Sequence, residues 1–166
     1  MSEDSRRDRR NHPYKNAMTI DHGQALIAPR NVALIGVSND PKKLSARPLQ
    51  FFKQHKFSGK IYLVNPLRQK VQGQTAFPSV SSITEKIDHA YIMLSTEMVE
   101  AALDDCIAAG VAVVSVLADG FAEVGEAGRE RQTRLVAKAD AAGIMMIGPN
   151  SMGVVNTKNG FICTTN

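Results

Sequence analysis

The chain has 166 residues, a length typical of one domain and too short for two domains with separate large cores. Hydrophobic residues make up 43% of it and charged residues 22%, a balance that excludes fibrous and wholly disordered proteins. The formal net charge is +4, and five of the basic residues fall within the first 17 positions. The nearly neutral body excludes nucleic acid as the predicted partner, and the lack of an apolar run of ~20 residues excludes the membrane.

The first segment of the chain differs from the rest. Residues 1–18 are mostly polar, charged and aperiodic, which predicts a disordered basic arm ahead of one folded domain over residues 19–166. No apolar core of a signal peptide is visible, so the sequence predicts a cytoplasmic protein. Cys106 and Cys163 form neither a disulfide framework nor a zinc-ligand spacing, and we identify no metal site and no catalytic constellation.

From residue 31 onward, short apolar runs alternate with amphipathic segments. Strands are predicted at residues 31–36, 60–64, 88–94, 111–117 and 144–148. Helices are predicted at residues 44–57, 79–86, 96–109 and 126–142. Residues 71–77 are either a short strand or an extended loop, and residues 154–156 add an edge strand. Apolar strands that alternate with helices indicate an α/β fold, a doubly wound, mainly parallel sheet of the Rossmann-like type.

Ligands of such folds bind at the carboxyl ends of the strands, so the loop after the first strand is a candidate site. Gly36 permits a tight turn there, and Ser38 and Asn39 supply polar groups. Lys42 and Lys43 follow within reach of a phosphate. Only the first glycine of a G-x-G-x-x-G motif is present, so the segment is either a phosphate-binding loop or a tight turn with two solvated lysines.

The loop after the second strand discriminates between nucleotides. A NAD site has Asp or Glu at this point to hold the ribose hydroxyls. This chain instead has Val64, Asn65 and Pro66, followed by Arg68 and Lys70. The presence of these cations and the absence of an acidic residue favour a ribose that bears a phosphate, as in NADP or coenzyme A. In the alternative interpretation Arg68 and Lys70 are ordinary surface charges.

Three later loops add polar candidates. Ser95 and Thr96 follow the third strand, where they either cap the next helix or contact a ligand. Gly120 follows the fourth strand and predicts a turn with unusual backbone angles. Asn150 follows the fifth strand, and its side chain can bond to a ligand or to its own turn.

Four segments carry a family resemblance. They are Asn31–Arg47 (NVALIGVSNDPKKLSAR), Gly59–Gln72 (GKIYLVNPLRQKVQ), Asp119–Gly128 (DGFAEVGEAG) and Ile147–Asn156 (IGPNSMGVVN). Together they resemble the CoA-binding domain of NDP-forming acyl-CoA synthetases, such as ADP-forming acetate–CoA ligase and the succinyl-CoA ligase alpha subunit. The resemblance covers residues 25–165 in order, so the four motifs support one another through their spacing.

The resemblance implies that the domain binds coenzyme A or acyl-CoA. It implies that the CoA phosphates are held by Gly36, Ser38 and Asn39, with Lys42 or Lys43. It implies that the nucleotide end is lined by Val64, Asn65, Pro66 and Arg68. It implies that Ser95 and Thr96 flank the path of the pantetheine arm, and that Gly120 and Asn150 lie toward the thiol.

The resemblance also implies what this chain does not carry. In the family, a transiently phosphorylated catalytic histidine belongs to a second α/β domain, and an ATP-grasp module handles the nucleotide. Neither is present in these 166 residues. We therefore expect the N-terminal CoA-binding part of a ligase that converts acid, CoA and ATP to acyl-CoA, ADP and phosphate. Its partners are the remaining ligase domains or subunits, and alone it is expected to be inactive.

Three interpretations stay open at this point. The chain is either such a ligase domain, a stand-alone CoA-sensing or regulatory module, or an NADP-binding domain. Tighter binding of NADP than of CoA would favour the last of these.

Overall fold

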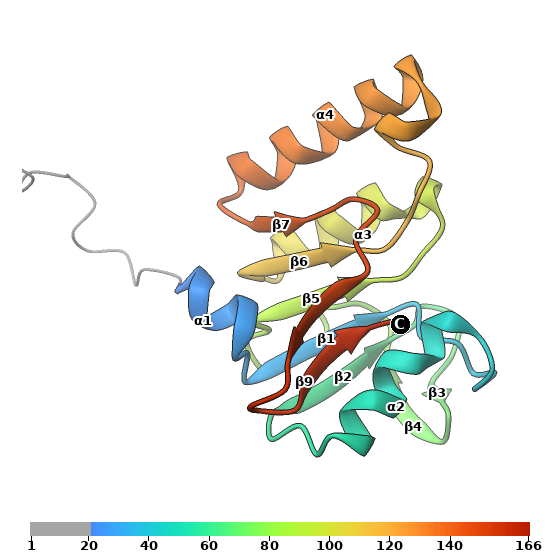
Figure 1. The fold of residues 1–166 in the computed structure, drawn as a ribbon, viewed down its shortest axis with the longest axis vertical. Helices are drawn as coiled ribbons and strands as arrows, with labels where there is room; N and C mark the ends of the chain where they lie inside the picture. The colour runs from blue at the N-terminus through green and yellow to red at the C-terminus, as the bar shows by residue number, and fades with distance from the viewer. Residues whose placement is uncertain (1–20) are drawn as a thin grey trace, which may run out of the picture.

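The computed structural model describes residues 21–166, so the disordered arm expected over residues 1–18 lies outside the described residues. Residues 21–166 contain nine strands: β1 (Asn31–Ile35), β2 (Lys60–Val64), β3 (Lys70–Val71), β4 (Gln74–Phe77), β5 (His89–Ile92), β6 (Val113–Val116), β7 (Met145–Ile147), β8 (Gly153–Asn156) and β9 (Phe161–Thr164). Seven of them form one sheet in the order β3-β4-β2-β1-β5-β6-β7. Neighbouring strands in this sheet run parallel, except that β3 and β4 are antiparallel to each other (Figure 1).

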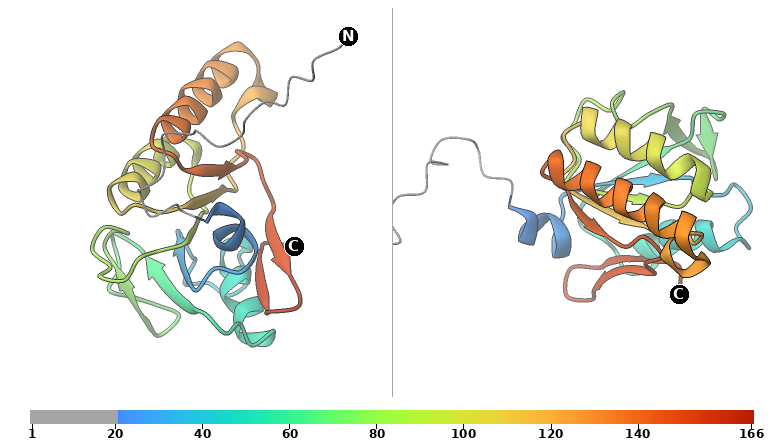
Figure 2. Two further views of the ribbon diagram at one scale, coloured as in Figure 1. Left: turned by 90° about the vertical axis from the view of Figure 1, so that its left-hand side faces the viewer. Right: turned by 90° about the horizontal axis from the view of Figure 1, so that it is seen from above.

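Helices cover both faces of this sheet. In the described part of the chain the α-helices are α1 (His22–Ile27), α2 (Arg47–Gln54), α3 (Thr96–Ala108) and α4 (Glu126–Ala141), and two 3₁₀ turns span Leu44–Ala46 and Ala122–Val124. One face carries α1, α2 and the antiparallel β8–β9 hairpin, and the other carries α3 and α4 (Figures 1 and 2). This arrangement confirms the predicted α/β fold with a doubly wound, mainly parallel sheet.

Burial on both faces explains why the strands are continuously apolar. Ala33 and Ile35 of β1 join the core beneath α3, whereas Val32 and Leu34 join the core beneath α2. On the α2 side, the ring centroids of Phe52 and Phe161 lie 5.8 Å apart. Successive side chains of a strand point to opposite faces, so a sheet covered twice needs apolar residues at every position.

Several predicted elements are revised by the structure. The helix expected over residues 44–57 begins as a 3₁₀ turn and is α-helical only as α2, with Pro48 in the first turn, where its missing N–H costs no hydrogen bond. Residues 71–77 belong to the β3–β4 hairpin, whose turn places Gln72 and Gly73 at positive φ. Residues 154–156 form a strand, but β8 pairs with β9 rather than with the edge of the main sheet.

The helix predicted for residues 79–86 is wrong. The carboxylate of Asp105 on α3 accepts hydrogen bonds from the backbone N–H of Val80 and of Ser81, and from the Ser81 hydroxyl at 2.6 Å. The Ser79 hydroxyl oxygen accepts the N–H of Ser82 at 3.2 Å. Serine and aspartate side chains therefore accept hydrogen bonds from the backbone N–H groups of this segment. These bonds stabilise turns and compete with the hydrogen bonds that a helix would make.

The short helix α1 was not predicted. The Asp21 carboxylate accepts the N–H of Gln24 at 2.9 Å and caps its first turn. The carbonyl of Ala25 lies 3.2 Å from Nδ1 of the fully buried His89, which connects α1 to the start of β5. Among the described residues, no helix is long and apolar enough to cross a bilayer.

Candidate functional site

The loops after β1 and β5 approach each other closely at the carboxyl edge of the sheet. Gly36 directly follows β1 with φ at +90°, and a Cβ at this position would lie 2.5 Å from the carbonyl oxygen of Met93. It would also lie 2.7 Å from Cδ2 of Leu94. Glycine is therefore required by both the backbone angle and the space. Since β1 has β2 on one side and β5 on the other, this is the switch point where ligands of such sheets bind.

The polar residues of the first loop are fixed by a residue that the sequence reasoning missed. Gln72, in the β3–β4 turn, donates its backbone N–H to Oδ1 of Asn39 at 2.7 Å. Its side-chain amide donates to the carbonyl of Ser38 at 2.9 Å. The Ser38 hydroxyl oxygen accepts the N–H of Asp40 at 3.1 Å. The loop is thus held in one conformation, with Asn39 exposed at its tip.

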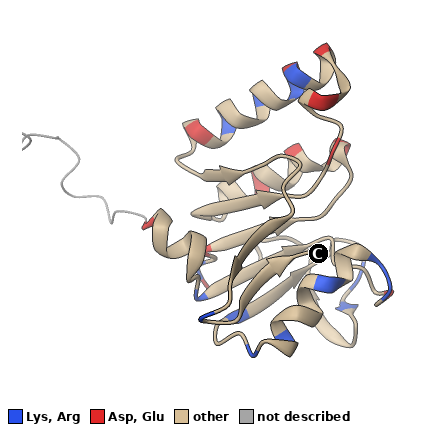
Figure 3. Ribbon diagram, viewed as in Figure 1, with Lys and Arg blue, Asp and Glu red and all other residues tan. Residues whose placement is uncertain are grey.

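Lys42 and Lys43 follow on the exposed part of the same loop. Figure 3 shows these positive charges on the segment that leaves β1. Asp40 shapes the turn, since its carboxylate accepts the N–H of Lys42 at 2.9 Å and its carbonyl accepts the N–H of Lys43 at 3.2 Å. The two ammonium groups therefore extend from a defined turn beside the switch point.

The loop after β2 is built around Asn65. Its Oδ1 accepts the N–H of Leu67 at 2.9 Å, and its own N–H donates to the carbonyl of Phe77 at 2.8 Å. Asn65 therefore shapes the turn with its side-chain oxygen, as Asx turns do. Arg68 lies exposed three residues further on.

An apolar groove lies beside these two loops, on the α3 face of the sheet. It has a volume of about 490 Å³ and combines Ile35, Val64, Pro66 and Leu94 with one side of α3. The α3 residues are Glu97, Met98, Ala101, Ala102 and Asp105. Val64 and Pro66 were predicted, whereas the helix side was missed. Its signal was present in the spacing of Met98, Ala101 and Ala102, small or apolar residues on one side of a helix.

The loops after β5 and β6 are joined by the side chain of Thr96. Its hydroxyl donates to the carbonyl of Asp119 at 2.7 Å. Gly120 has φ at +81°, and a Cβ there would lie 3.0 Å from Oγ1 of Thr96. Ser95 occupies the N-cap position of α3 but makes no side-chain capping bond. The capping role considered for Ser95 and Thr96 is therefore not the one observed.

Charged side chains hold the Gly120 turn. The Glu123 carboxylate accepts the N–H of Gly120 at 2.6 Å and of Phe121 at 3.1 Å. Hydrogen bonds from the backbone N–H groups of Glu123 itself, Phe121 and Gly120 lower the pKa of this carboxyl. Arg131 of α4 donates to the carbonyl of Gly120 at 2.6 Å. Sequence reasoning missed Arg131, which lies eleven residues away on the next helix.

Asn150 is brought to the same edge. It lies exposed at φ +57°, and its backbone N–H donates to the carbonyl of Ala118 at 2.9 Å. The next residue, Ser151, donates its N–H to the carbonyl of Val116 at 2.9 Å. The loop after β7 is therefore joined to Val116 at the end of β6 and to Ala118, two residues before Gly120. Within residues 21–166, no group of three or more His, Cys, Asp or Glu side chains is placed to hold a metal ion.

Residues 30–157 match the sequence model of the CoA binding domain family. The chain belongs to this family. It is a CoA-binding domain homologous to a part of NDP-forming acyl-CoA synthetases, and the alternative of an NADP-binding domain or a stand-alone module is not favoured.

Two curated relatives and one solved structure illustrate the similarity of this CoA-binding domain. It is 40% identical over 129 residues to the alpha subunit of ADP-forming acetate–CoA ligase II from Pyrococcus furiosus, covering 78% of this chain and 28% of the relative. It is 36% identical over 144 residues to ADP-forming acetate–CoA ligase II from Archaeoglobus fulgidus, covering 87% and 21%.

The solved structure is the dinucleotide forming acetyl-coenzyme A synthetase 1 of Ca. Korarchaeum cryptofilum, in complex with phosphate and ADP. It matches with a TM-score of 0.81 and 31% identity, over 89% of this chain and 31% of that one. The CoA-binding domain thus spans less than a third of these three proteins.

Proposed function

We propose that this domain binds coenzyme A across the carboxyl edge of its sheet, with the nucleotide end in the groove between α3 and the end of β2. The observation that carries the proposal is the groove itself. Its apolar walls, among them Ile35, Val64 and Met98, suit the faces of an adenine ring, and they lie beside the lysine-bearing loop. Pockets of this size and composition are typical small-molecule sites.

The charges beside the groove match those of CoA. Lys42 and Lys43 supply positive charge for its diphosphate, and Ser38 and Asn39 add polar contacts. Arg68, beyond the end of β2, is proposed to contact the 3′-phosphate that distinguishes CoA from NAD. A NAD site would need a carboxylate after β2, whereas this loop contains Asn65, whose side-chain oxygen already accepts an N–H of its own turn.

The remaining sequence-predicted residues follow the edge of the sheet away from the groove. The pantetheine arm is proposed to pass Ser95 and Thr96, so that the thiol ends near Gly120 and Asn150. Because Thr96, Glu123 and Arg131 hold this part of the edge in place, the thiol would be oriented before an acyl donor arrives. The domain would supply binding and orientation rather than bond-making.

We propose that CoA is a substrate here, used by a larger ligase that forms acyl-CoA, ADP and phosphate from an acid, CoA and ATP. In this proposal residues 19–166 are the CoA-binding domain. Other domains or subunits carry the phosphorylated histidine and the ATP-grasp module. The relatives named above as acetate–CoA ligases support this assignment. A cytoplasmic location stays a prediction.

Isothermal titration tests the proposal directly. We expect CoA to bind more tightly than dephospho-CoA, NADP or NAD. Substitution Ala101→Trp fills the groove and is expected to weaken CoA binding at least tenfold, whereas Ala108→Trp is expected to leave it unchanged. Ala108 is an exposed residue two turns along the same helix and outside the groove. Tighter binding of NADP, or equal CoA affinity in both variants, would contradict the proposal.

A further inference from the structure

The helix α4 is the outermost element at one end of the molecule, beyond the edge strand β7 (Figures 1 and 2). Gly128, Leu135 and Ala139 form its buried side. Next to that side runs an open groove of about 520 Å³. Apart from Ala122, its walls are six residues of α4: Arg129, Gln132, Thr133, Val136, Ala137 and Asp140.

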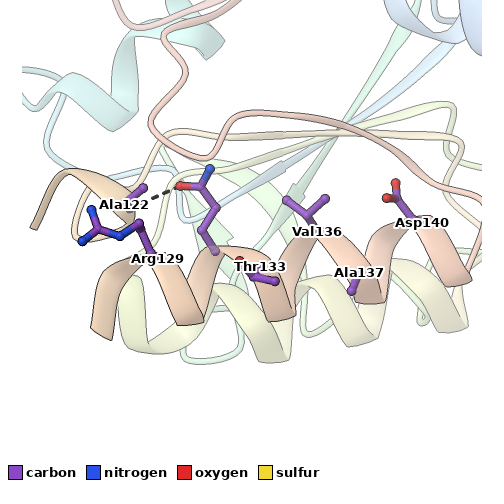
Figure 4. Close-up of a pocket in the computed structure, with 7 residues that line it drawn as sticks. Ala122, Arg129, Thr133, Val136, Ala137 and Asp140 are labelled. Atoms are coloured by element: carbon purple, nitrogen blue, oxygen red, sulfur yellow. Dashed lines mark hydrogen bonds between the residues drawn. The ribbon is translucent and has the colours of Figure 1, made fainter. Parts of the chain in front are cut away.

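These six residues, here called the α4 stripe, form a band along the helix, with Val136 and Asp140 on one side of it and Thr133 and Ala137 on the other (Figure 4). Their spacing of three and one residues follows the helical repeat. Arg129 and Asp140 stand at opposite ends, about 16 Å apart at 1.5 Å per residue. Thr133, Val136 and Ala137 lie between them and are small or apolar. The stripe therefore has a positive end, a negative end and a centre that permits close approach of another helix.

The order of the residues makes the α4 stripe complementary to itself. If a second α4 lies antiparallel across it, with a two-fold axis through the middle, Arg129 faces the partner's Asp140. Thr133 and Val136 then lie next to the two-fold axis, close to the same two residues of the partner. The opposite-charge pair of Arg129 and Asp140 thus occurs twice, once at each end, and no like charges of the stripe meet. Such self-complementarity is what a two-fold interface requires.

Arg129 is available for such a pair. It lies 3.6 Å from Glu126 within its own helix, but both side chains are largely exposed, at 59% and 85%. An exposed pair of this kind contributes little to stability, so its exchange for an intermolecular pair costs little. Gln132 is already ordered, because its side-chain oxygen accepts the N–H of Ala122 at 3.2 Å.

We infer that the α4 stripe is a docking surface for a second copy of this chain, and that the two copies pair through antiparallel α4 helices. The inference is independent of the CoA proposal, because the groove at α3 and the α4 stripe share no residue. The contact is small, so the dimer is a weak one that depends on protein concentration and, through its ion pairs, on salt.

Charge exchange provides the test. Sedimentation equilibrium of the 166-residue chain at low salt is expected to show a mass that rises from 18.0 kDa toward twice that value with concentration. Arg129→Asp and Asp140→Arg, each alone, place like charges opposite each other and are expected to weaken association about tenfold or more. The double variant Arg129→Asp/Asp140→Arg restores opposite charges and is expected to associate like the original chain.

Mixing the two single variants gives a second form of rescue. In the mixed pair, Asp at 129 faces Arg at 140, and Arg129 of the other copy faces Asp140, so heterodimers are expected to form. Glu130→Lys changes an exposed residue of α4 outside the stripe and is the matched control, expected to associate normally. A monomer at every concentration, unaltered association in the single variants, or failure of both rescues would overturn the inference.

Discussion

The hydroxyl of Thr96 donates a 2.7 Å hydrogen bond to the backbone carbonyl of Asp119, and this bond joins the loop after β5 to the loop after β6. Substitution Thr96→Val keeps the shape of the side chain and removes the donor. We expect a loss of about 1 kcal/mol in the free energy of unfolding and several-fold weaker CoA binding, because the Gly120 turn loses a support. Urea denaturation and calorimetric titration measure the two effects.

The variant Thr96→Ser is the matched control for this bond, because it retains the hydroxyl. It is expected to recover most of the CoA affinity. If Thr96→Val bound CoA and unfolded like the original chain, the bond would have no role in the site.

Removal of both lysines from the first loop is expected to weaken CoA binding. For Lys42→Ala/Lys43→Ala we predict a loss of roughly 1–3 kcal/mol, the scale of charge-assisted contacts to phosphate. The loss should shrink at high salt because these side chains are exposed. Lys53→Ala/Lys56→Ala removes the same charge at the far end of α2 and is expected to have little effect. Unchanged calorimetric affinity in the first variant would remove the lysines from the site.

Arg68→Ala is expected to separate CoA from dephospho-CoA. A contact between Arg68 and the 3′-phosphate is lost only for CoA, so the variant should bind CoA more weakly and dephospho-CoA as before. Arg30→Ala removes an exposed arginine that precedes β1, at the opposite edge of the sheet, and serves as the control. Equal losses for the two ligands would show that Arg68 does not contact the 3′-phosphate.

The buried His89 is expected to make stability depend on pH. Its Nδ1 lies 3.2 Å from the carbonyl of Ala25 and its Nε2 lies 2.8 Å from the Ser115 hydroxyl. Burial lowers the pKa of this imidazole to about 4, whereas the unfolded chain has the ordinary value of about 6.5. The unfolded state therefore binds the proton more readily than the folded state does.

The stabilisation from neutral His89 is accordingly complete above pH 6.5 and is lost as the pH falls from about 6.5 to about 4. The loss is about 3 kcal/mol for this one group. Urea unfolding at a series of pH values measures it as a difference between the original chain and His89→Gln, which should lack this slope. His22→Gln, at the start of α1, should keep it. An identical slope in His89→Gln would contradict the assignment.

The sheet was predictable because its strands are short runs in which nearly every residue is apolar. Local patterns of this kind also placed α3 and α4 to within a few residues. The segment at residues 79–86 was not predictable in the same way, because its turns depend on Asp105, about 25 residues further along the chain. Local periodicity contains no information about such a partner.

The candidate site was likewise predictable only in part. Glycines and polar residues after strands identified the loops, since fold topology alone brings those loops to one edge. The groove and the supports of the loops depend on tertiary contacts, such as Gln72 with Asn39 and Arg131 with Gly120. A single sequence does not reveal these pairs, because the partners lie in elements whose relative placement the packing decides.

The family match ends at residue 157, but the aromatic core does not. Phe161 of β9 lies 5.8 Å from Phe52 and 5.7 Å from Phe57, between ring centroids, and all of β9 is buried. A truncated protein that ended at residue 157 would lack one wall of this core and would leave the rings of Phe52 and Phe57 open to water. The segment that completes this core is therefore longer than the segment that matches the family model.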